Sequence, residues 1–252
     1  MFTLDELQQS ISRCGNTSMG PDKIHYAFFR HLQGEQLQVI LAMINCIWRQ
    51  GRLPDEWKHP IIVPLLKPGK PKVYAESYRP TQLTSCFCKV MERMVAQRLT
   101  WFVESKQLIS KYQCAFKKGR STTDHLVRLE SEVRRGFFYH QYTLAVFFDL
   151  KSAYNLTSKA ALLTKMYNLG FRGRLMHFID SYLDNRTFQV RNGVLSDTFQ
   201  QQNGLVQGGV LSPILFNIMI NDIFDNIDED VSRAIYADDC SMWVRVDGFP
   251  IW

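Results

Sequence analysis

The sequence lacks any apolar run long enough to cross a membrane. A spanning helix needs about 18 or more consecutive apolar residues, and no stretch of this 252-residue chain reaches that length. The first residues, which include Asp5 and Glu6, also lack the positively charged start and apolar centre of a secretory signal peptide. We therefore expect an intracellular protein, cytoplasmic or nuclear and not secreted, with no membrane partner.

Cysteine and histidine are too scattered to predict a zinc site or a disulfide framework. The six cysteines are spread along the chain, and Cys86 and Cys88 have no second pair at zinc-binding spacing. The six histidines are equally dispersed. We expect six free thiols and no disulfides, and the sequence specifies no oligomeric state.

The sequence does contain enough apolar residues for a core, and its charge is distributed unevenly. Hydrophobic residues make up 46% of the chain, which places it among globular proteins of one large or two small domains. Residues 49–135 carry 18 basic and 8 acidic side chains, a net charge of +10, whereas residues 1–48 carry −1 and residues 136–252 carry −3. A basic segment suits phosphate binding and an acidic one suits metal binding, although basicity alone does not identify a nucleic-acid partner.

Hydrophobic periodicity predicts a mixture of helices and strands. Apolar residues at helical spacing predict helices over residues 4–11 and 36–50, the second of which ends at Gly51. Residues 60–66 form a short apolar stretch with prolines, as in an edge strand. Further helices are expected over residues 87–102, after the Ser-x-x-Asp capping box that starts at Ser121, and over 158–169 and 175–183, with a hairpin at 187–195.

Two adjacent carboxylates, Asp238 and Asp239, lie between β-prone stretches within residues 234–243. Asp is favoured in tight turns because its side chain bonds to nearby backbone, so we expect a hairpin with this pair at its tip. Two like charges side by side repel each other unless a cation neutralises them, and Mg²⁺ prefers carboxylate oxygens. An isolated pair is more often a solvated turn, so a metal site needs further carboxylates.

A third carboxylate, Asp149, ends an apolar stretch at residues 144–148. A buried strand that delivers one charged group to the edge of a sheet has this pattern. Two-metal phosphoryl transfer needs carboxylates that hold two ions about 3.5–4 Å apart. A strand end beside a hairpin tip supplies that geometry, so we predict a metal site made by Asp149, Asp238 and Asp239, with the backbone carbonyl of Leu150 as a further ligand.

The order of these motifs resembles the palm of reverse transcriptases, in particular those of LINE-like or jockey-like retrotransposons, which have no long terminal repeats. The resemblance extends over roughly residues 51–243 and rests on the strand that ends at Asp149, the glycine-rich segment 203–213, Tyr236-Ala237-Asp238-Asp239, Lys67-Pro68-Gly69-Lys70, Ser77-Tyr78-Arg79-Pro80 and Phe116-Lys117-Lys118-Gly119-Arg120-Ser121-Thr122.

The resemblance implies an α+β fold of the right-hand polymerase type, in which an antiparallel palm sheet is flanked by helices. It places an N-terminal helical segment at residues 1–50, leading into the fingers. The reverse transcriptase domain then covers 51–252, with fingers at about 51–140 and an incomplete palm at about 141–252. The thumb of the family is missing from this pattern, so we expect a truncated domain.

The resemblance also implies an RNA-directed DNA polymerase that uses an RNA template, a DNA primer, dNTPs and two Mg²⁺ ions, with Mn²⁺ as a substitute. Asp149 and Asp238 would be the principal catalytic ligands, and Asp239 would be less directly engaged. Lys67 and Arg79 would contact the phosphates of the incoming nucleotide, because a lysine point charge and a forked arginine neutralise a triphosphate.

Further nucleotide contacts implied by the resemblance come from Leu150, Tyr154, Gln207 and Gly208. The ring of Tyr154 would clash with a 2′-hydroxyl and so select deoxyribonucleotides. Gln207 and Gly208 would position the nucleotide or the template base, since glycine allows close backbone approach. The template would be held by the basic loop residues Lys117, Lys118 and Arg120.

The chain departs from the family pattern at Asn155, where Asp is usual, at Val206, where many relatives have Pro, and at Gly209, which replaces a frequent Ser. The missing thumb, Asn155 and Val206 leave a second hypothesis open, in which the chain is an inactive retroelement remnant that at most binds nucleic acid. An RNA-templated RNA polymerase is a third hypothesis, and it predicts no discrimination against ribonucleotides.

Overall fold

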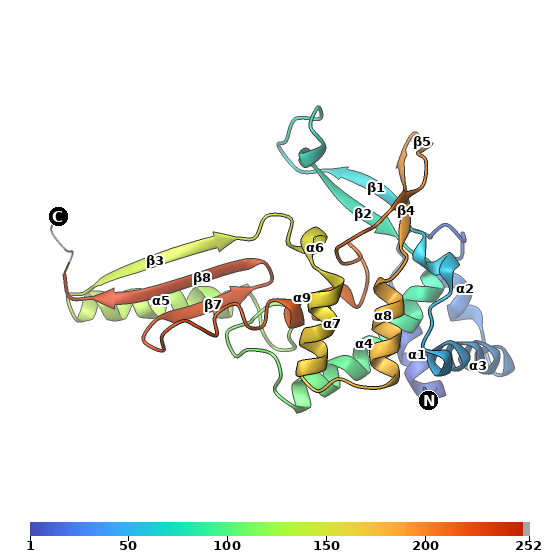
Figure 1. Cartoon of the computed structure of the whole chain (residues 1–252), viewed down its shortest axis with the longest axis horizontal. Helices are drawn as coiled ribbons and strands as arrows, with labels where there is room; N and C mark the ends of the chain where they lie inside the picture. Colours follow the sequence, from blue (N-terminus) through green and yellow to red (C-terminus); the bar gives the residue numbers. More distant parts are fainter. Residues whose placement is uncertain (249–252) are drawn as a thin grey trace. The chain divides into compact units, whose positions relative to one another are not determined.

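A computed structural model of the chain describes residues 1–248. The last four residues of the domain expected at 51–252 lie outside the described residues. The described chain has an α+β fold that divides into two compact units, each built from segments distant in sequence (Figure 1). The first unit contains residues 1–102 and 154–212, and the second contains 103–153 and the chain from 213 onward. Both units therefore take residues from either side of the fingers–palm division expected near residue 140.

The first unit contains a mixed sheet in which β1 is antiparallel to β2 and parallel to β4. The strand order is β2-β1-β4-β5, and β6 pairs with the start of β4. Gly193, with φ 79°, makes the tight turn between β4 and β5. The strands of this sheet are β1 (Ile61–Leu66), β2 (Tyr78–Leu83), β4 (Thr187–Asn192), β5 (Val194–Leu195) and β6 (Phe199–Gln200).

Helices supply most of the buried core of the first unit. The ring of Trp48 lies 5.0 Å from that of Phe2 and 5.6 Å from that of Phe178, which joins the N-terminal segment to α3 and α8. The helices are α1 (Leu4–Ser12), α2 (Tyr26–His31), α3 (Glu35–Gln50), α7 (Lys159–Asn168) and α8 (Arg174–Leu183), with the short 3₁₀ turns η1 (Asp55–Lys58) and η2 (Ala75–Ser77). The helices α4 (Cys86–Ser105) and α6 (Ala153–Leu156) cross the division between the units.

The helix ends predicted from the sequence are confirmed. Gly51 ends α3 in the left-handed conformation that glycine adopts without strain, with φ 66°. Ser158 caps α7 through a hydrogen bond from the Ala161 N–H. The capping box at Ser121 and Asp124 begins α5 (Thr122–Phe138).

The second unit contains a three-stranded antiparallel sheet in the order β3-β8-β7, with α5 packed along it (Figure 1). Its strands are β3 (Tyr142–Asp149), β7 (Ser232–Tyr236) and β8 (Asp239–Val246), and α9 (Ser212–Met219) precedes β7. His125 of α5 lies 2.9 Å from the hydroxyl of Ser241 on β8. Arg245 of β8 forms an ion pair with Glu132 of α5 at 3.2 Å.

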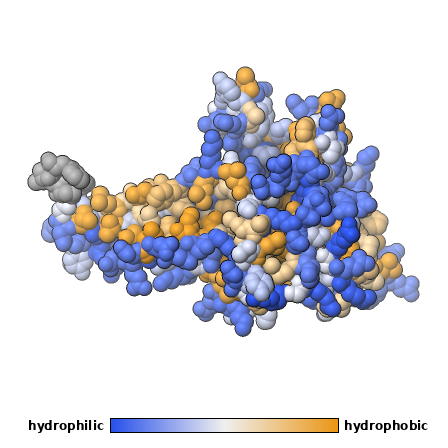
Figure 2. Space-filling model, in the orientation of Figure 1, coloured by the Kyte–Doolittle hydropathy of each residue, from blue (hydrophilic) through white to orange (hydrophobic). Residues whose placement is uncertain are grey.

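The expectation that the strand ending at Asp149 is buried is wrong. Its apolar side chains are exposed, including Val146 at 52% and Phe147 at 66%. β3 lies at one edge of the sheet, and seven of its eight residues are exposed, so neither of its faces is buried in the part of the chain that the structure describes. Apolar residues accordingly gather on the surface over β3 and β8 in Figure 2.

All six cysteines are free thiols, as expected. Within residues 1–248, no helix is both long and apolar enough to cross a membrane.

Candidate active site

The second unit brings two of the predicted carboxylates together on adjacent strands. Asp149, the last residue of β3, is the cross-strand partner of Asp239, the first residue of β8. Directly opposed residues of an antiparallel pair project from the same face, with Cβ atoms about 4.5–5.5 Å apart. Both side chains are exposed. Asp149 and Asp239 therefore lie side by side at one end of the sheet.

The third carboxylate lies in the turn that joins β7 to β8. Tyr236 pairs with Asp239, so Ala237 and Asp238 form a two-residue hairpin turn. The hairpin expected from the sequence is confirmed, but its tip is shifted by one residue, because Asp239 already belongs to the strand. Ala237 has φ 55°, a conformation that L-residues rarely adopt, and this arrangement places Asp238 beside Asp239.

A buried glutamine that sequence reasoning missed holds this turn in place. The Oε1 atom of Gln113 accepts the N–H groups of Ala237 at 3.2 Å and Ala115 at 2.8 Å. The flanking backbone pairs with β7, since Cys114 donates to the Ile235 carbonyl at 2.9 Å. Gln113 is only 2% exposed, so its side chain makes these bonds in the protein interior. An isolated Gln in a loop gives no sequence signal for this role.

The site has a concentrated negative charge. Burial, followed by the charges of Asp239 and Asp238, raises the pKa of the Cys240 thiol to about 11. Burial and the nearby Arg128 lower the pKa of His125, and the charge of Asp239 acts in the opposite direction. The charge of Asp239, at the start of β8, thus acts on both Cys240 and His125.

The donor set suits a hard divalent cation. Mg²⁺ is commonly held by one or two carboxylates together with substrate phosphates, and Asp149 and Asp239 supply such a pair. No group of three metal-binding side chains is found among residues 1–248. The carbonyl of Leu150 accepts the Ala153 N–H at 3.2 Å, which leaves one lone pair for a further ligand.

The predicted phosphate-binding residues lie on the β1–β2 hairpin of the first unit. Lys67 is half-buried, and its ammonium donates to the Glu76 carbonyl at 3.0 Å. Arg79 is exposed on β2, opposite Leu65 of β1. Of the two, Arg79 is the side chain that stands open to solvent.

The glycine-rich segment of the first unit packs on α6, which carries Tyr154 and Asn155. The Tyr154 carbonyl accepts the Leu205 N–H at 2.8 Å. The side-chain amide of Gln207 donates to Asn155 Oδ1 at 2.7 Å. The backbone carbonyl of Gln207 accepts the backbone N–H of Gln82, in β2, at 3.0 Å. Gly208 has φ 92°, which demands glycine. The structure thus brings Gln207, Gly208 and Tyr154 into one local arrangement.

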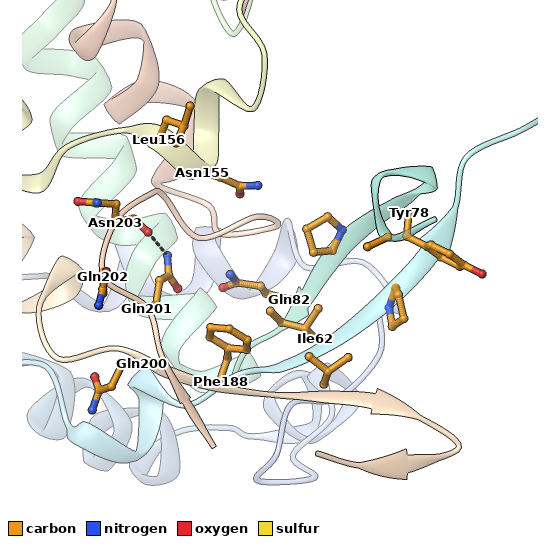
Figure 3. A pocket seen from close by; sticks show the side chains of 14 residues that line it. Ile62, Tyr78, Gln82, Asn155, Leu156, Phe188, Gln200, Gln201, Gln202 and Asn203 are labelled. Atoms are coloured by element: carbon orange, nitrogen blue, oxygen red, sulfur yellow. Dashed lines mark hydrogen bonds between the residues drawn. The ribbon is translucent and has the colours of Figure 1, made fainter. Parts of the chain in front are cut away.

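A pocket of about 630 Å³ lies beside this segment in the first unit (Figure 3). The side chains of Gln82 and Asn155 and the ring of Phe188 are among those that line it (Figure 3). Gln201 donates to the Asn203 carbonyl at 3.2 Å, which fixes part of the wall. Amide groups next to aromatic faces match the edges and faces of nucleobases.

The basic loop of the second unit is only partly open to a ligand. The Lys117 ammonium donates to the carbonyls of Ser110 at 2.9 Å and Ile109 at 3.3 Å, and burial lowers its pKa. Arg120 forms an ion pair with Asp124 at 3.2 Å. Lys118 is exposed.

Comparison with protein families and curated proteins gives consistent matches. The model of the family described as "Reverse transcriptase (RNA-dependent DNA polymerase)" matches residues 66–245. The probable RNA-directed DNA polymerase from transposon BS of Drosophila melanogaster is 31% identical over 207 residues, which is 82% of this chain and 23% of that protein. The RNA-directed DNA polymerase from mobile element jockey of the same organism is 29% identical over 251 residues, which is 96% of this chain and 27% of that protein.

Among solved structures, this chain is similar to apo telomerase from Candida tropicalis truncated from its C-terminal domain. The TM-score is 0.54 at 12% identity, and the match covers 85% of this chain and 50% of that one. This likeness supports the right-hand polymerase type of α+β fold. The chain spans about a quarter of the length of the two curated relatives.

Proposed function

Because this chain belongs to the reverse transcriptase family, we propose that it carries out RNA-templated DNA synthesis by transfer of nucleotides from dNTPs to a primer 3′-hydroxyl. The observation that carries the proposal is the cross-strand pairing of Asp149 with Asp239 next to the turn residue Asp238. Carboxylates at one sheet end are what a metal-assisted phosphoryl transfer requires.

In this proposal, Asp149, Asp238, Asp239 and the Leu150 carbonyl hold two Mg²⁺ ions. When bound, these ions supply activation of the primer hydroxyl and charge neutralisation at the leaving pyrophosphate. The exposure of Asp149 and Asp239 keeps their oxygens accessible to ions and substrate. The hydrogen bond from Ala237 to Gln113 keeps Asp238 at the turn.

The nucleotide-binding roles are part of the same proposal and are supported by family membership. Arg79 and Lys67 neutralise the triphosphate, and Gln207 and Gly208 position the nucleotide or template base. Tyr154 excludes a 2′-hydroxyl, so Tyr154→Ala is expected to raise incorporation of ribonucleotides relative to deoxyribonucleotides. Equal discrimination by the variant and the wild type would contradict this role.

Template binding is assigned to Lys117, Lys118 and Arg120, with Lys118 making the most accessible contact. The amide-rich pocket is proposed to receive a template base against Phe188. Phe188→Ala is expected to weaken binding of a single-stranded template by about 1–3 kcal/mol, the usual worth of one stacked base. Unchanged affinity would remove the pocket from the proposal.

Primer extension on an RNA template with Mg²⁺ tests the proposal. Asp149→Asn and Asp238→Asn should each reduce extension by at least about 100-fold, because each removes a charge that the transition state needs. Asp197→Asn is the matched control, since Asp197 is an exposed carboxylate outside the site. Undiminished extension by Asp149→Asn would refute the mechanism.

A second readout does not need activity. Mg²⁺ should raise the melting temperature of the wild type and of Asp197→Asn, but not that of Asp149→Asn, because a ligand that binds only the folded protein stabilises it. Equal shifts in all three proteins would place the ion elsewhere.

The alternative proposal is an inactive remnant that only binds nucleic acid. It is favoured by Asn155 and Val206, which depart from the family pattern, and by the basic segment at residues 49–135. Extension by the purified 252-residue protein would exclude it.

A further inference from the structure

A buried carboxylate outside the proposed metal site joins three elements of the first unit. Glu92 of α4 is fully buried, with 0% exposure. Its Oε2 atom accepts hydrogen bonds from the N–H groups of Val210 at 2.7 Å and Leu211 at 3.3 Å, and from the Tyr182 hydroxyl at 3.1 Å. A buried carboxylate is stable only where such donors replace water. The Cys88 thiol also donates to Oε1 at 3.5 Å, so two of the four donors are backbone groups of the glycine-rich segment.

The same segment presents Gln207 and Gly208. It is closed into a turn by the bond from the Gly209 N–H to the Val206 carbonyl at 2.9 Å. The hydroxyl of Ser212 also donates to that carbonyl, at 2.6 Å. Glu92 therefore holds the residues that directly follow this turn, while Gln207 contacts Asn155 and Gln82 on the other side.

Gly209 packs against the hydroxyl of Tyr182, which is also a partner of Glu92. The φ of Gly209 is not positive, so the backbone conformation does not demand glycine. A Cβ atom at this position would lie 2.5 Å from the Tyr182 hydroxyl oxygen, closer than such contacts occur. Tyr182 is fully buried, and burial followed by the charge of Glu92 raises its pKa, which keeps the hydroxyl protonated as a donor. The hydroxyl that faces Gly209 is the same group that donates to Glu92.

We propose that Glu92 is a positioning residue that fixes the loop carrying Gln207 and Gly208, and that Tyr182 and Gly209 form the second half of this anchor. The consequence for DNA synthesis rests on the proposed function, but the anchoring itself does not. Glu92 touches neither the three predicted metal ligands nor the predicted phosphate-binding side chains. Its effect on extension passes through the loop.

Hydrogen exchange of the Val210 and Leu211 amides tests the anchor directly. Glu92→Leu keeps an apolar side chain in the core but removes the acceptor, so these amides should exchange about 10- to 100-fold faster, the range that charge-assisted hydrogen bonds supply. Glu92→Gln keeps one acceptor oxygen and should fall between this variant and the wild type. Amides of α3 in the same unit are the internal control and should keep their protection. Unchanged exchange at Val210 and Leu211, with α3 intact, would overturn the proposal.

A double-mutant cycle tests the fit of Gly209 under Tyr182. Gly209→Ala should accelerate exchange of the Val210 and Leu211 amides, because the new methyl group displaces the hydroxyl. Tyr182→Phe removes that oxygen and should reduce the effect of Gly209→Ala at least about threefold in the double variant, since contacting residues are coupled. Independent, additive effects would show that the two positions do not share this contact.

Kinetics then connect the anchor to function. Glu92→Gln should raise the KM for dNTP about three- to tenfold with a smaller change in kcat, because a loosened loop binds nucleotide less well before chemistry. A three- to tenfold loss of kcat with unchanged KM would contradict a role of Glu92 through the loop. If the wild type does not extend primers, the proposed function fails while the exchange experiment still decides whether Glu92 anchors the loop.

Discussion

Asn155 stands where the family pattern has Asp. The hydrogen bond between Asn155 and Gln207 explains why Asn at this position is compatible with an intact loop around Gln207. The Oδ1 atom of Asn155 accepts the hydrogen bond from the Gln207 amide at 2.7 Å, and a carboxylate oxygen would accept the same bond. Asn155→Asp should therefore leave the KM for dNTP within about twofold of wild type, whereas Asn155→Leu should raise it, because one neutral hydrogen bond is worth about 0.5–1.5 kcal/mol.

Steady-state extension kinetics check the Asn155 prediction. Asn168→Leu, an exposed asparagine at the end of α7, is the matched control and should behave as wild type. A large loss in Asn155→Asp with normal Asn155→Leu kinetics would mean that charge, and not hydrogen bonding, governs this position.

Individual residues differed in how well the sequence predicted them. The positions of Asp149, Asp238 and Asp239 at a strand end and a turn were predictable, because carboxylates between apolar stretches stand out from their surroundings. Val206, which replaces a frequent proline, is buried, and its carbonyl closes the turn by accepting bonds from Gly209 and Ser212. Glu92 gave a weak signal as a charged residue on the buried face of α4. The Cys88 thiol donates to it locally at 3.5 Å, but Tyr182 and Val210 are more than 85 residues away. No local pattern contains such contacts.

At the scale of elements, α1 shows how a short helix depends on one ion pair. Glu6 closes a capping box with Thr3 and pairs with Arg98 of α4 at 2.7 Å. Burial alone would raise the pKa of Glu6, but its hydrogen bonds and the charge of Arg98 lower it below the usual 4.5. Because the folded-state pKa is depressed, the stabilisation is complete above pH 4.5 and is lost as pH falls through the lower folded value.

Glu6→Gln should accordingly destabilise the protein by about 0.5–1 kcal/mol at neutral pH, a small value because the pair is partly exposed and screened. The difference from wild type should shrink as pH falls below 4.5. Denaturant unfolding at several pH values measures it, with Asp5→Asn on the same turn as the control. A difference that stays constant down to pH 3 would show that the charge of Glu6 is irrelevant.

The exposed edge strand β3 gives a prediction about packing. Phe147→Lys should change the free energy of unfolding by less than about 1 kcal/mol, because the Phe147 side chain is 66% exposed. Ile235→Lys in β7 of the same sheet is the contrasting change: Ile235 is 1% exposed, so burying an unpaired charge there should abolish cooperative unfolding. Thermal melts distinguish these outcomes, and an equal loss in both variants would mean that β3 is covered in solution.

Most element boundaries were predictable because caps and turns are local chemistry, as at Gly51, Ser121 and Ser158. The exposure of β3 was not predictable, since an apolar run of strand length does not show whether the strand is covered. The parallel pairing of β1 with β4 was also beyond the sequence, because these strands are more than 120 residues apart. Strand order depends on tertiary packing that no short window contains.

At the scale of the whole molecule, the uneven charge predicts how nucleic acid binding responds to salt. Residues 49–135 carry a net charge of +10, and Lys70 and Lys72 are exposed cations within that segment. Each lysine that neutralises a phosphate releases counterions and contributes about 0.7 to the slope of log K against log salt for single strands and about 0.9 for duplexes.

Lys70→Gln combined with Lys72→Gln should therefore reduce that slope by about 1.4 to 1.8 if both side chains contact phosphate. Arg13→Gln combined with Lys23→Gln removes the same charge from exposed positions in residues 1–48, where the net charge is −1, and should leave the slope unchanged. Titration of a labelled RNA–DNA hybrid at several salt concentrations measures both. Equal reductions in the two double variants would show that net charge alone governs binding, and that the basic segment is an ordinary solvated surface. A selective reduction combined with failure to extend a primer would identify a nucleic-acid-binding remnant, whereas a selective reduction combined with extension would support the polymerase.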